Sequence, residues 1–450
     1  MALVMKSPGF LVLALALATA GISFAQVPAP AGSAPPPPPG QGAGMNSDGG
    51  PGQGQGQAAE AGPAQGAKAS PAEMYSIEQS VSDKAQLSTI SFSALAFMTG
   101  TFGADSFLPP GKVADYFGFQ YMRDIDASEA GHNMMFLTNI GNATLAVLDD
   151  RQKASLLALA KEQELPYREL AEKRLVVIKA FRDNMEGKAP SGTSLSSKAV
   201  MAWVSDIFAI DVQLALGRAT VYGAIARSLS AAQKSSIAKL KFGDSGTWPS
   251  LPDQYDKRTM SHGQDVLYMT YASEFFSWYA GSEDADVYFC PERHGTYFGG
   301  FYMKDYPAMG KADYFIPTAL TGDSGEAFLA LLSPAQSERI TTILEPLGPI
   351  LKEILEIRRT ISKSFRSTIT GTAIDKEEVL RLSRRYGELD GQLAWEEASR
   401  FAEVYRTLTA EQKSAMVKLR NQDIFPKGYY LYADPMEKVV TIDDSALFSK

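Results

Sequence analysis

Four short boxes of the form Leu-(Ser/Thr/Asp)-x-x-Gln recur along this chain and constrain its fold more than any other feature. The first two begin at positions 148 and 229 and the last two at 332 and 408, so the intervals within the two pairs are nearly equal. This spacing indicates that the boxes bracket two similar segments. The boxes run from Leu148 to Gln152, from Leu229 to Gln233, from Leu332 to Gln336 and from Leu408 to Gln412.

Other parts of the sequence repeat at nearly the same interval. A shift of 181 places Tyr-Phe-Gly at 116–118 on the same tripeptide at 297–299, and a shift of 179 places Asp211 on Asp390. At a shift of 184, Phe181-Arg182 falls on Phe365-Arg366. Small loop insertions account for the drift. We therefore expect residues 72–255 to form one unit and residues 256–450 a second unit with a C-terminal tail.

Within each unit the apolar residues recur at steps of three and four, which predicts helices. A first long helix should end at Gly187 in one unit and at Gly371 in the other. Pro166 in the first unit, and Pro346 and Pro349 in the second, should kink or split it. A second long helix is expected over roughly 196–228 and 375–407, and the closing box then starts a third helix.

The predicted fold class is all-α, with the two tandem helical units packed as a pseudo-twofold pair. Shorter helices are expected over 91–98 and 266–279. The aromatic stretches that follow, with Gly and Pro among their residues, should be irregular.

The N-terminus has the features of an export signal. Lys6 precedes an apolar run, and small residues stand at Ser23 and Ala25, so we expect residues 1–25 to be a cleaved signal peptide. Residues 26–71 are rich in Gly and Pro, contain no aromatic residue and should form a disordered tether. No later stretch reaches the roughly 20 apolar residues of a membrane-spanning helix. Together these features predict a periplasmic or secreted protein without a stable membrane span.

Composition excludes some classes of partner. The formal net charge is −8, and loss of Lys6 makes it more negative, which disfavours nucleic-acid binding because phosphates require a basic patch. Cys290 is the single cysteine, so no intrachain disulfide can form. Packing must therefore stabilise the fold, and we expect a monomer whose two units form an internal pseudo-dimer.

Each box has a direct physical meaning. In Leu-Ser-x-x-Gln the hydroxyl can accept a hydrogen bond from the amide of the glutamine, while the glutamine side chain accepts one from the amide of the serine. Pro334 at the first helical position of the third box fits this geometry. Alone, a box predicts only the start of a helix, so the paired arrangement carries the information.

That arrangement resembles the Spy/CpxP family of periplasmic proteins, which is named for paired Leu-Thr-x-x-Gln motifs. The resemblance covers about 148–240 and 332–420 and rests on a box, an Arg/Glu-rich helix, a turn, a second helix and a closing box. It implies helical hairpins that pair into a cradle, and a non-enzymatic function in the envelope. Members act as ATP-independent chaperones for unfolded proteins or as stress-response regulators, and related proteins bind metals.

Two alternatives remain open beside a chaperone. Cys290 and His294 lie close in sequence and could bind copper or zinc with His132 or His262, because soft and imidazole ligands favour these metals. Against this, the spacing matches no standard zinc motif, and a buried, inert thiol explains Cys290 as well. The second alternative is a structural secreted protein without cofactor or ligand.

Three further features have less specific interpretations. Gly-Asp-Ser-Gly occurs at 243–246 and 322–325, as around a protease nucleophile, but no histidine lies in a partner motif, so we interpret both as turn or helix-cap sequences and expect no enzyme. The aromatic stretch over 268–306 could be a recognition surface, but packing between the units is favoured. Asp211 and Asp390 lie inside apolar helices, where we expect a buried polar network.

Overall fold

The computed structural model describes residues 83–99, 134–240, 249, 257–281, 283, 318–419 and 442–450. Most of these residues are helical, which confirms the all-α class. Two short strands, β1 (Ser194–Leu195) and β2 (Phe448–Ser449), pair antiparallel. The predicted signal peptide, the tether and most of the aromatic stretches over 97–124 and 276–306 lie outside the described residues.

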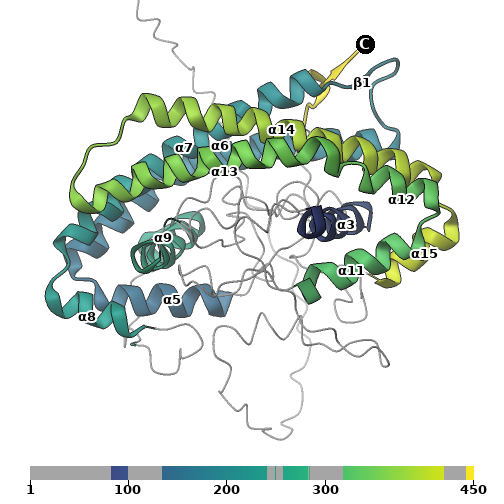
Figure 1. The fold of residues 1–450 in the computed structure, drawn as a ribbon. Helices are drawn as coiled ribbons and strands as arrows, with labels where there is room; N and C mark the ends of the chain where they lie inside the picture. The colour runs from purple at the N-terminus through teal and green to yellow at the C-terminus, as the bar shows by residue number, and fades with distance from the viewer. Residues whose placement is uncertain are drawn as a thin grey trace, which may run out of the picture. The chain divides into compact units, whose positions relative to one another are not determined.

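Four long helices form the centre of the described part. They form two hairpins, α6 with α7 and α13 with α14, and α14 packs along α7 and also contacts α6. Figure 1 shows α13 and α14 lying across α6 and α7. The bounds are α6 (Asp150–Glu186), α7 (Ser197–Ser228), α13 (Leu344–Arg366) and α14 (Lys376–Thr407).

Shorter helices pack against this centre in two groups (Figure 1). One group joins α5 (Met134–Val147), α8 (Ala231–Lys239) and α9 (His262–Ala280), and α9 also contacts α6 and α7. The other joins α3 (Asp83–Thr99), α11 (Thr318–Leu331), α12 (Pro334–Thr341) and α15 (Ala410–Leu419), and α3 also contacts α13 and α14. Single 3-10 turns are η3 (Lys257–Thr259), η5 (Ser367–Thr370) and η6 (Ser445–Leu447).

The helix ends follow from local sequence. Ser196 caps α7 by accepting a hydrogen bond from the Ala199 amide at 3.3 Å, and Asp375 caps α14 through the Glu378 amide at 3.0 Å. Gly187 ends α6 at φ 72°, and Gly371 follows η5 at φ 87°, both in the left-handed region that favours glycine. The predicted second long helices are therefore confirmed nearly to the residue.

Proline has different effects in the two hairpins. Helix α6 continues through Pro166 and α13 continues through Pro349, so neither proline splits its helix, one of the two effects predicted for them. In the other hairpin the break lies at Thr342 and Ile343, between α12 and α13. Pro346 is the third residue of α13, where a missing amide hydrogen costs nothing, but its ring would clash with the carbonyl of residue 342 if the helix were continuous. The break at Thr342 and Ile343 removes that clash.

The two hairpins approach each other closely at glycines. A Cβ on Gly387 would lie 2.7 Å from the Ser205 Cα and 2.8 Å from the Val204 carbonyl oxygen. On Gly391 it would lie 2.9 Å from the Met201 Cα. Helix α7 is long and apolar enough to span a membrane by length and composition, unlike the sequence expectation, but most of its apolar window is buried in the protein. We interpret α7 as a core helix.

The described part of the aromatic stretch lies in α9 and is mostly buried. Tyr271, Phe275 and Trp278 are fully inaccessible, and Tyr222 of α7 contacts the rings of Phe275 and Trp278 edge-on or tilted. Helix α9 precedes the second pair of boxes and packs on the helices of the first pair. Its described aromatic residues therefore belong to the core rather than to an exposed recognition surface.

Candidate functional site

All four boxes are reciprocal helix caps. In each, the side chain of the second residue accepts a hydrogen bond from the backbone amide of the glutamine, and the glutamine Oε1 accepts one from the backbone amide of that second residue. Helices α6, α8, α12 and α15 begin in this way, and the first box shows that aspartate serves as well as serine or threonine. The pairs are Asp149 with Gln152, Ser230 with Gln233, Ser333 with Gln336 and Thr409 with Gln412.

The glutamines also join the boxes in pairs. The Gln233 Nε2 donates to the Gln152 Oε1 at 2.7 Å, and the Gln412 Nε2 donates to the Gln336 Oε1 at 2.8 Å. Each Oε1 of Gln152 and Gln336 therefore accepts from its own cap and from the second glutamine. The two pairs thus have the same geometry in two places along the chain.

Each pair also holds the end of a preceding helix. The Gln233 Nε2 donates to the Val147 carbonyl at the end of α5 at 3.0 Å, and the Gln412 Nε2 donates to the Leu331 carbonyl at the end of α11 at 2.9 Å. Carbonyls in the last turn of a helix have no amide donor within that helix. One glutamine therefore closes the start of one helix and the end of another.

The leucines of the boxes lie beneath these polar contacts. Leu148, Leu229 and Leu408 are buried, and Leu332 is half-buried. Gln152 itself is buried, and its Nε2 donates to the Ser228 hydroxyl at the end of α7 at 2.9 Å. The sequence of each box predicts its cap but not the bonds between boxes, for which the nearly equal spacing of the two pairs was the available signal.

A buried cluster of charged side chains lies between α6, α7 and α9. The Arg218 Nη1 donates to both carboxylate oxygens of Glu274, at 3.0 and 3.2 Å, and the Tyr222 hydroxyl donates to the same carboxylate at 3.2 Å. The Arg218 Nη2 lies 3.8 Å from the Asp211 Oδ1. The predicted polar network at Asp211 is therefore present. The pairing of Arg218 with Glu274 was missed because the two residues lie far apart in the sequence, on different helices.

Burial dominates the electrostatics of this cluster. Asp211 is fully inaccessible, and desolvation raises its pKa to about 7 although Arg218 and Arg174 act to lower it. Desolvation also raises the pKa of Glu274, against the lowering effect of Arg218. No described residue donates a hydrogen bond to either oxygen of the Asp211 carboxylate. Asp211 is therefore a group whose charge is costly at neutral pH.

Uncharged hydrogen bonds continue the cluster into α6. The Tyr271 hydroxyl of α9 donates to the Gln163 Oε1 at 2.6 Å, and the Gln163 Nε2 donates to the Leu214 carbonyl of α7 at 3.0 Å. Because these groups are buried, the cluster joins α6, α7 and α9 inside the core. In the described packing its carboxylates are buried, so a substrate cannot reach them.

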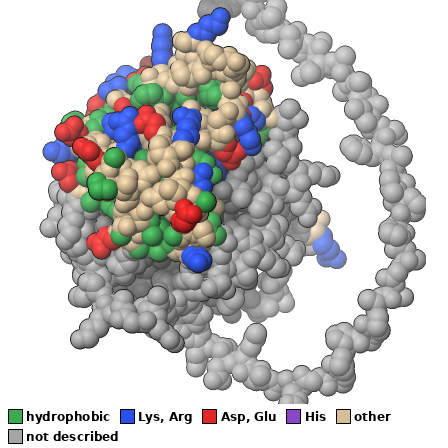
Figure 2. All heavy atoms as spheres, turned by 90° about the vertical axis from the view of Figure 1, so that its right-hand side faces the viewer, with side chains coloured by type: hydrophobic (Ala, Val, Ile, Leu, Met, Phe, Trp, Pro, Cys, Tyr) green, Lys and Arg blue, Asp and Glu red, His purple; other side chains and the backbone are tan. Residues whose placement is uncertain are grey.

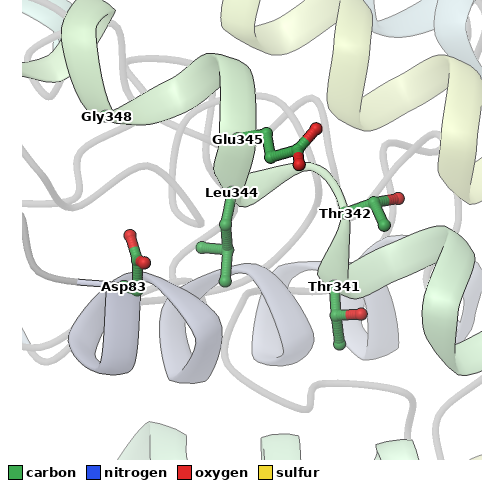
Figure 3. Close-up of a pocket in the computed structure, with 6 residues that line it drawn as sticks. All are labelled: Asp83, Thr341, Thr342, Leu344, Glu345 and Gly348. Atoms are coloured by element: carbon green, nitrogen blue, oxygen red, sulfur yellow. The ribbon is translucent and has the colours of Figure 1, made fainter.

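A pocket of about 380 Å³ lies between α3 and the junction of α12 with α13 (Figure 3). Its polar groups are the carboxylates of Asp83 and Glu345 and the hydroxyls of Thr341 and Thr342. Figure 3 shows Leu344 between the two carboxylates, which extend in different directions. Among the described residues, this lining contains no histidine, cysteine or basic residue.

The predicted metal ligands stay untested. Cys290, His294 and His132 lie outside the described residues, and the side chain of His262, the first residue of α9, is not described either. In the part of the chain that the structure describes, no group of three His, Cys, Asp or Glu side chains could hold a metal ion.

The two Gly-Asp-Ser-Gly sequences differ in position. The first, at 243–246, lies outside the described residues. The second, at 322–325, lies inside α11, so its interpretation as a turn or helix cap is wrong. A regular helix continues through it, since all four residues can adopt helical dihedral angles.

Comparisons with known proteins identify no relative. No protein-family model, no curated protein and no solved structure matches this chain.

Proposed function

We propose that this chain is an exported, non-enzymatic helical protein that resembles two fused Spy/CpxP units and binds unfolded or partner proteins without ATP. The observation that carries the proposal is the closely similar bonding of the two pairs of boxes. Gln152 with Gln233, and Gln336 with Gln412, each close the open end of a helical hairpin. That is the element for which the family is named.

Contacts between the hairpins support a pseudo-twofold arrangement. The Ser205 hydroxyl donates to the Arg384 carbonyl at 3.0 Å, and these two residues correspond to each other at the shift of 179. A contact of a residue with its own counterpart is what a twofold axis requires. The Ser383 hydroxyl donates to the Phe208 carbonyl at 3.0 Å, and the counterparts of these two, Val204 and Gly387, also touch.

Contacts at the turns of the hairpins recur in the same way. The Arg227 guanidinium donates to the Thr368 carbonyl, and its counterpart Arg406 donates to the Asn184 carbonyl. Arg182 lies 4.7 Å from the ring centroid of Phe97. At the corresponding place Arg366 lies 5.7 Å from that of Trp278. Agreement at separate places favours descent of both halves from one unit.

The surface of the described residues favours reversible binding. Leu165 and Val417 are its exposed large apolar side chains, 73% and 40% accessible. Figure 2 shows side chains of both charges scattered among apolar ones on the face that it draws. Among the described residues, such a surface has no large apolar patch to hold a partner permanently. Loose, mixed contacts suit a protein that must release unfolded chains without ATP.

The test is suppression of aggregation. Purified protein, without nucleotide, should reduce the light scattering of a chemically denatured client diluted into buffer at equimolar to several-fold excess. The double variant Leu165→Ser, Val417→Ser should suppress less, whereas Ala202→Ser, at another exposed helical position, should equal wild type. Unchanged client scattering at several-fold excess would contradict the proposal and favour a structural role.

A further inference from the structure

The loop between α6 and α7 differs from its counterpart in the other hairpin. Gly187 corresponds to Gly371 at a shift of 184, whereas the caps Ser196 and Asp375 correspond at 179, so the first loop contains five additional residues. Strand β1 lies in this insertion. The duplicated fold does not need β1, since the second hairpin closes without an equivalent strand in its loop.

The inserted strand β1 pairs with a short segment from the other end of the sequence. Residues Ser194 and Leu195 pair with Ser449 and Phe448, and the Ser196 amide donates to the Leu447 carbonyl at 2.9 Å. Backbone pairing of this kind is how extended peptides add to an exposed strand.

Side chains give this pairing a recognisable pattern. Leu447 is fully inaccessible, and Phe448 is 9% accessible. Three residues before Leu447, the Asp444 carboxylate accepts from the Lys179 Nζ at 3.0 Å. The segment therefore presents an acidic residue followed by a Leu-Phe pair. The acidic residue binds the Lys179 cation, the Leu-Phe pair is buried, and the backbone pairs with β1.

The residues that bind the segment are also held by bonds that do not involve it. The Trp395 Nε1 of α14 donates to the Leu195 carbonyl at 3.0 Å, on the acceptor strand rather than on the segment. Lys179 also bonds Asp183 within α6. Both bonds leave the acceptor strand and the lysine in place if the segment departs.

We propose that the α6–α7 loop, with Lys179 and Trp395, is a binding site for an extended peptide that carries an acidic residue three positions before a Leu-Phe pair. Residues 442–450 are its intramolecular occupant and block it until they are released. This inference does not depend on the proposed chaperone function. A tethered occupant acts at an effective concentration in the millimolar range, so a free peptide competes poorly with it.

The experiment uses the full chain with its own segment weakened. The double variant Leu447→Asp, Phe448→Ser should bind a fluorescein-labelled peptide of residues 442–450, measured by anisotropy, at least tenfold more tightly than wild type. A peptide with the Leu447→Asp change, and one with Asp444→Ala, should bind the variant at least tenfold and severalfold more weakly, respectively. The proposal is overturned if the double variant keeps its helical content but binds no peptide at millimolar concentration. It is also overturned if wild type binds the peptide as tightly as the double variant does.

A second measurement keeps the test independent of the folding of that variant. Hydrogen exchange of unmodified protein should show the Ser196 and Ser449 amides exchanging faster than the buried amides of α7, because the segment is released without unfolding of the helices. Excess unlabelled peptide should restore protection at Ser196 but not at Ser449. Exchange of both amides only with global unfolding would overturn the proposal.

Discussion

The glutamine that ends each box forms more bonds than a helix cap requires. Gln233 accepts from the Ser230 amide at 2.9 Å and donates to both Gln152 and the Val147 carbonyl. Ser or Thr alone at the cap would satisfy one amide. The long amide side chain is needed because it has an acceptor for its own helix and donors for the neighbouring helices.

Replacing Gln233 with alanine should destabilise the protein by about 2 kcal/mol, because a cap and two bonds to neighbouring helix ends are lost together. Urea unfolding followed by circular dichroism measures this. Gln213→Ala is the matched control, since Gln213 is exposed on α7, and it should change stability by less than about 0.5 kcal/mol. Equal effects of the two substitutions would show that the pairing of the boxes contributes nothing.

Asp211 should make stability depend on pH in an unusual direction. Its folded-state pKa of about 7 lies above the ordinary value of 3.8, so between these values the folded protein holds a proton that the unfolded chain has lost. Stability contributed by this group is therefore present below about pH 4 and is lost as pH rises towards 7. Asp211→Asn removes the contribution of this group to the dependence.

As the pH rises from 5 to 8, the Asp211→Asn variant should therefore gain on the order of 2 kcal/mol of unfolding free energy relative to wild type. Urea unfolding at both pH values measures the difference. Asp206→Asn, on the same helix with an exposed side chain, should show no comparable gain. A difference between Asp211→Asn and wild type that is the same at pH 5 and pH 8 would contradict the assignment.

At the scale of helices, the crossing of α7 with α14 depends on glycine. Gly387→Ala places a methyl group within 3 Å of the backbone of Ser205 and Val204, which cannot move without displacing α7. We expect a loss of about 1–3 kcal/mol in unfolding free energy. Gly348→Ala in α13 is the control, because nothing lies within 4 Å of the added carbon, and it should be neutral or slightly stabilising. Similar losses for both would mean that the close approach of α14 to α7 at Gly387 does not set the effect.

Helix positions were predictable where local chemistry decides them. Ser196, Asp375 and Gly187 mark helix ends by capping and by positive φ, so α7 and α14 were predicted nearly to the residue. At Pro166 the sequence predicted a kink or a split and could not decide between them, because tertiary packing can outweigh one lost hydrogen bond. Strand β1 is very short and exists through pairing with a segment at the far end of the sequence, a contact that no local pattern encodes.

The same limit applies to the candidate site. The boxes predicted helix starts because a cap joins residues that are close together in the sequence. The bonds between Gln152 and Gln233, and the cluster of Arg218 with Glu274, join residues on different helices. Asp211 was recognisable as a polar residue in an apolar helix, but the carboxylate on α9 that shares Arg218 with it could be identified only once the packing of α9 was known.

At the scale of the whole molecule, the packing of two helices departs from the two units that the sequence predicts. Helix α3 comes before the first pair of boxes and packs on α11, α13 and α14, whereas α9 comes before the second pair and packs on α5, α6 and α7. Sequence units and packing units are therefore different. The two predicted units are therefore hard to separate into independent halves, because each half buries a helix from the other.

Two fragments of equal length distinguish these divisions. Residues 72–255 follow the sequence unit and contain α3, whereas residues 100–283 follow the packing and contain α9 with its buried Tyr271, Phe275 and Trp278. Both fragments expose the same face of α7 that α14 normally covers, so they differ mainly in whether they contain α3 or α9. Because α9 brings the partners of Arg218 and Tyr222, we expect residues 100–283 to be the more helical and to melt cooperatively, and residues 72–255 to melt without a clear transition.

Circular dichroism melts at low micromolar concentration measure this difference, with size-exclusion chromatography as a check for aggregates. A fragment 72–255 that is as stable as 100–283 would mean that α3 packs on its own unit when the other half is missing, so that its packing on the other half is not required for the fold.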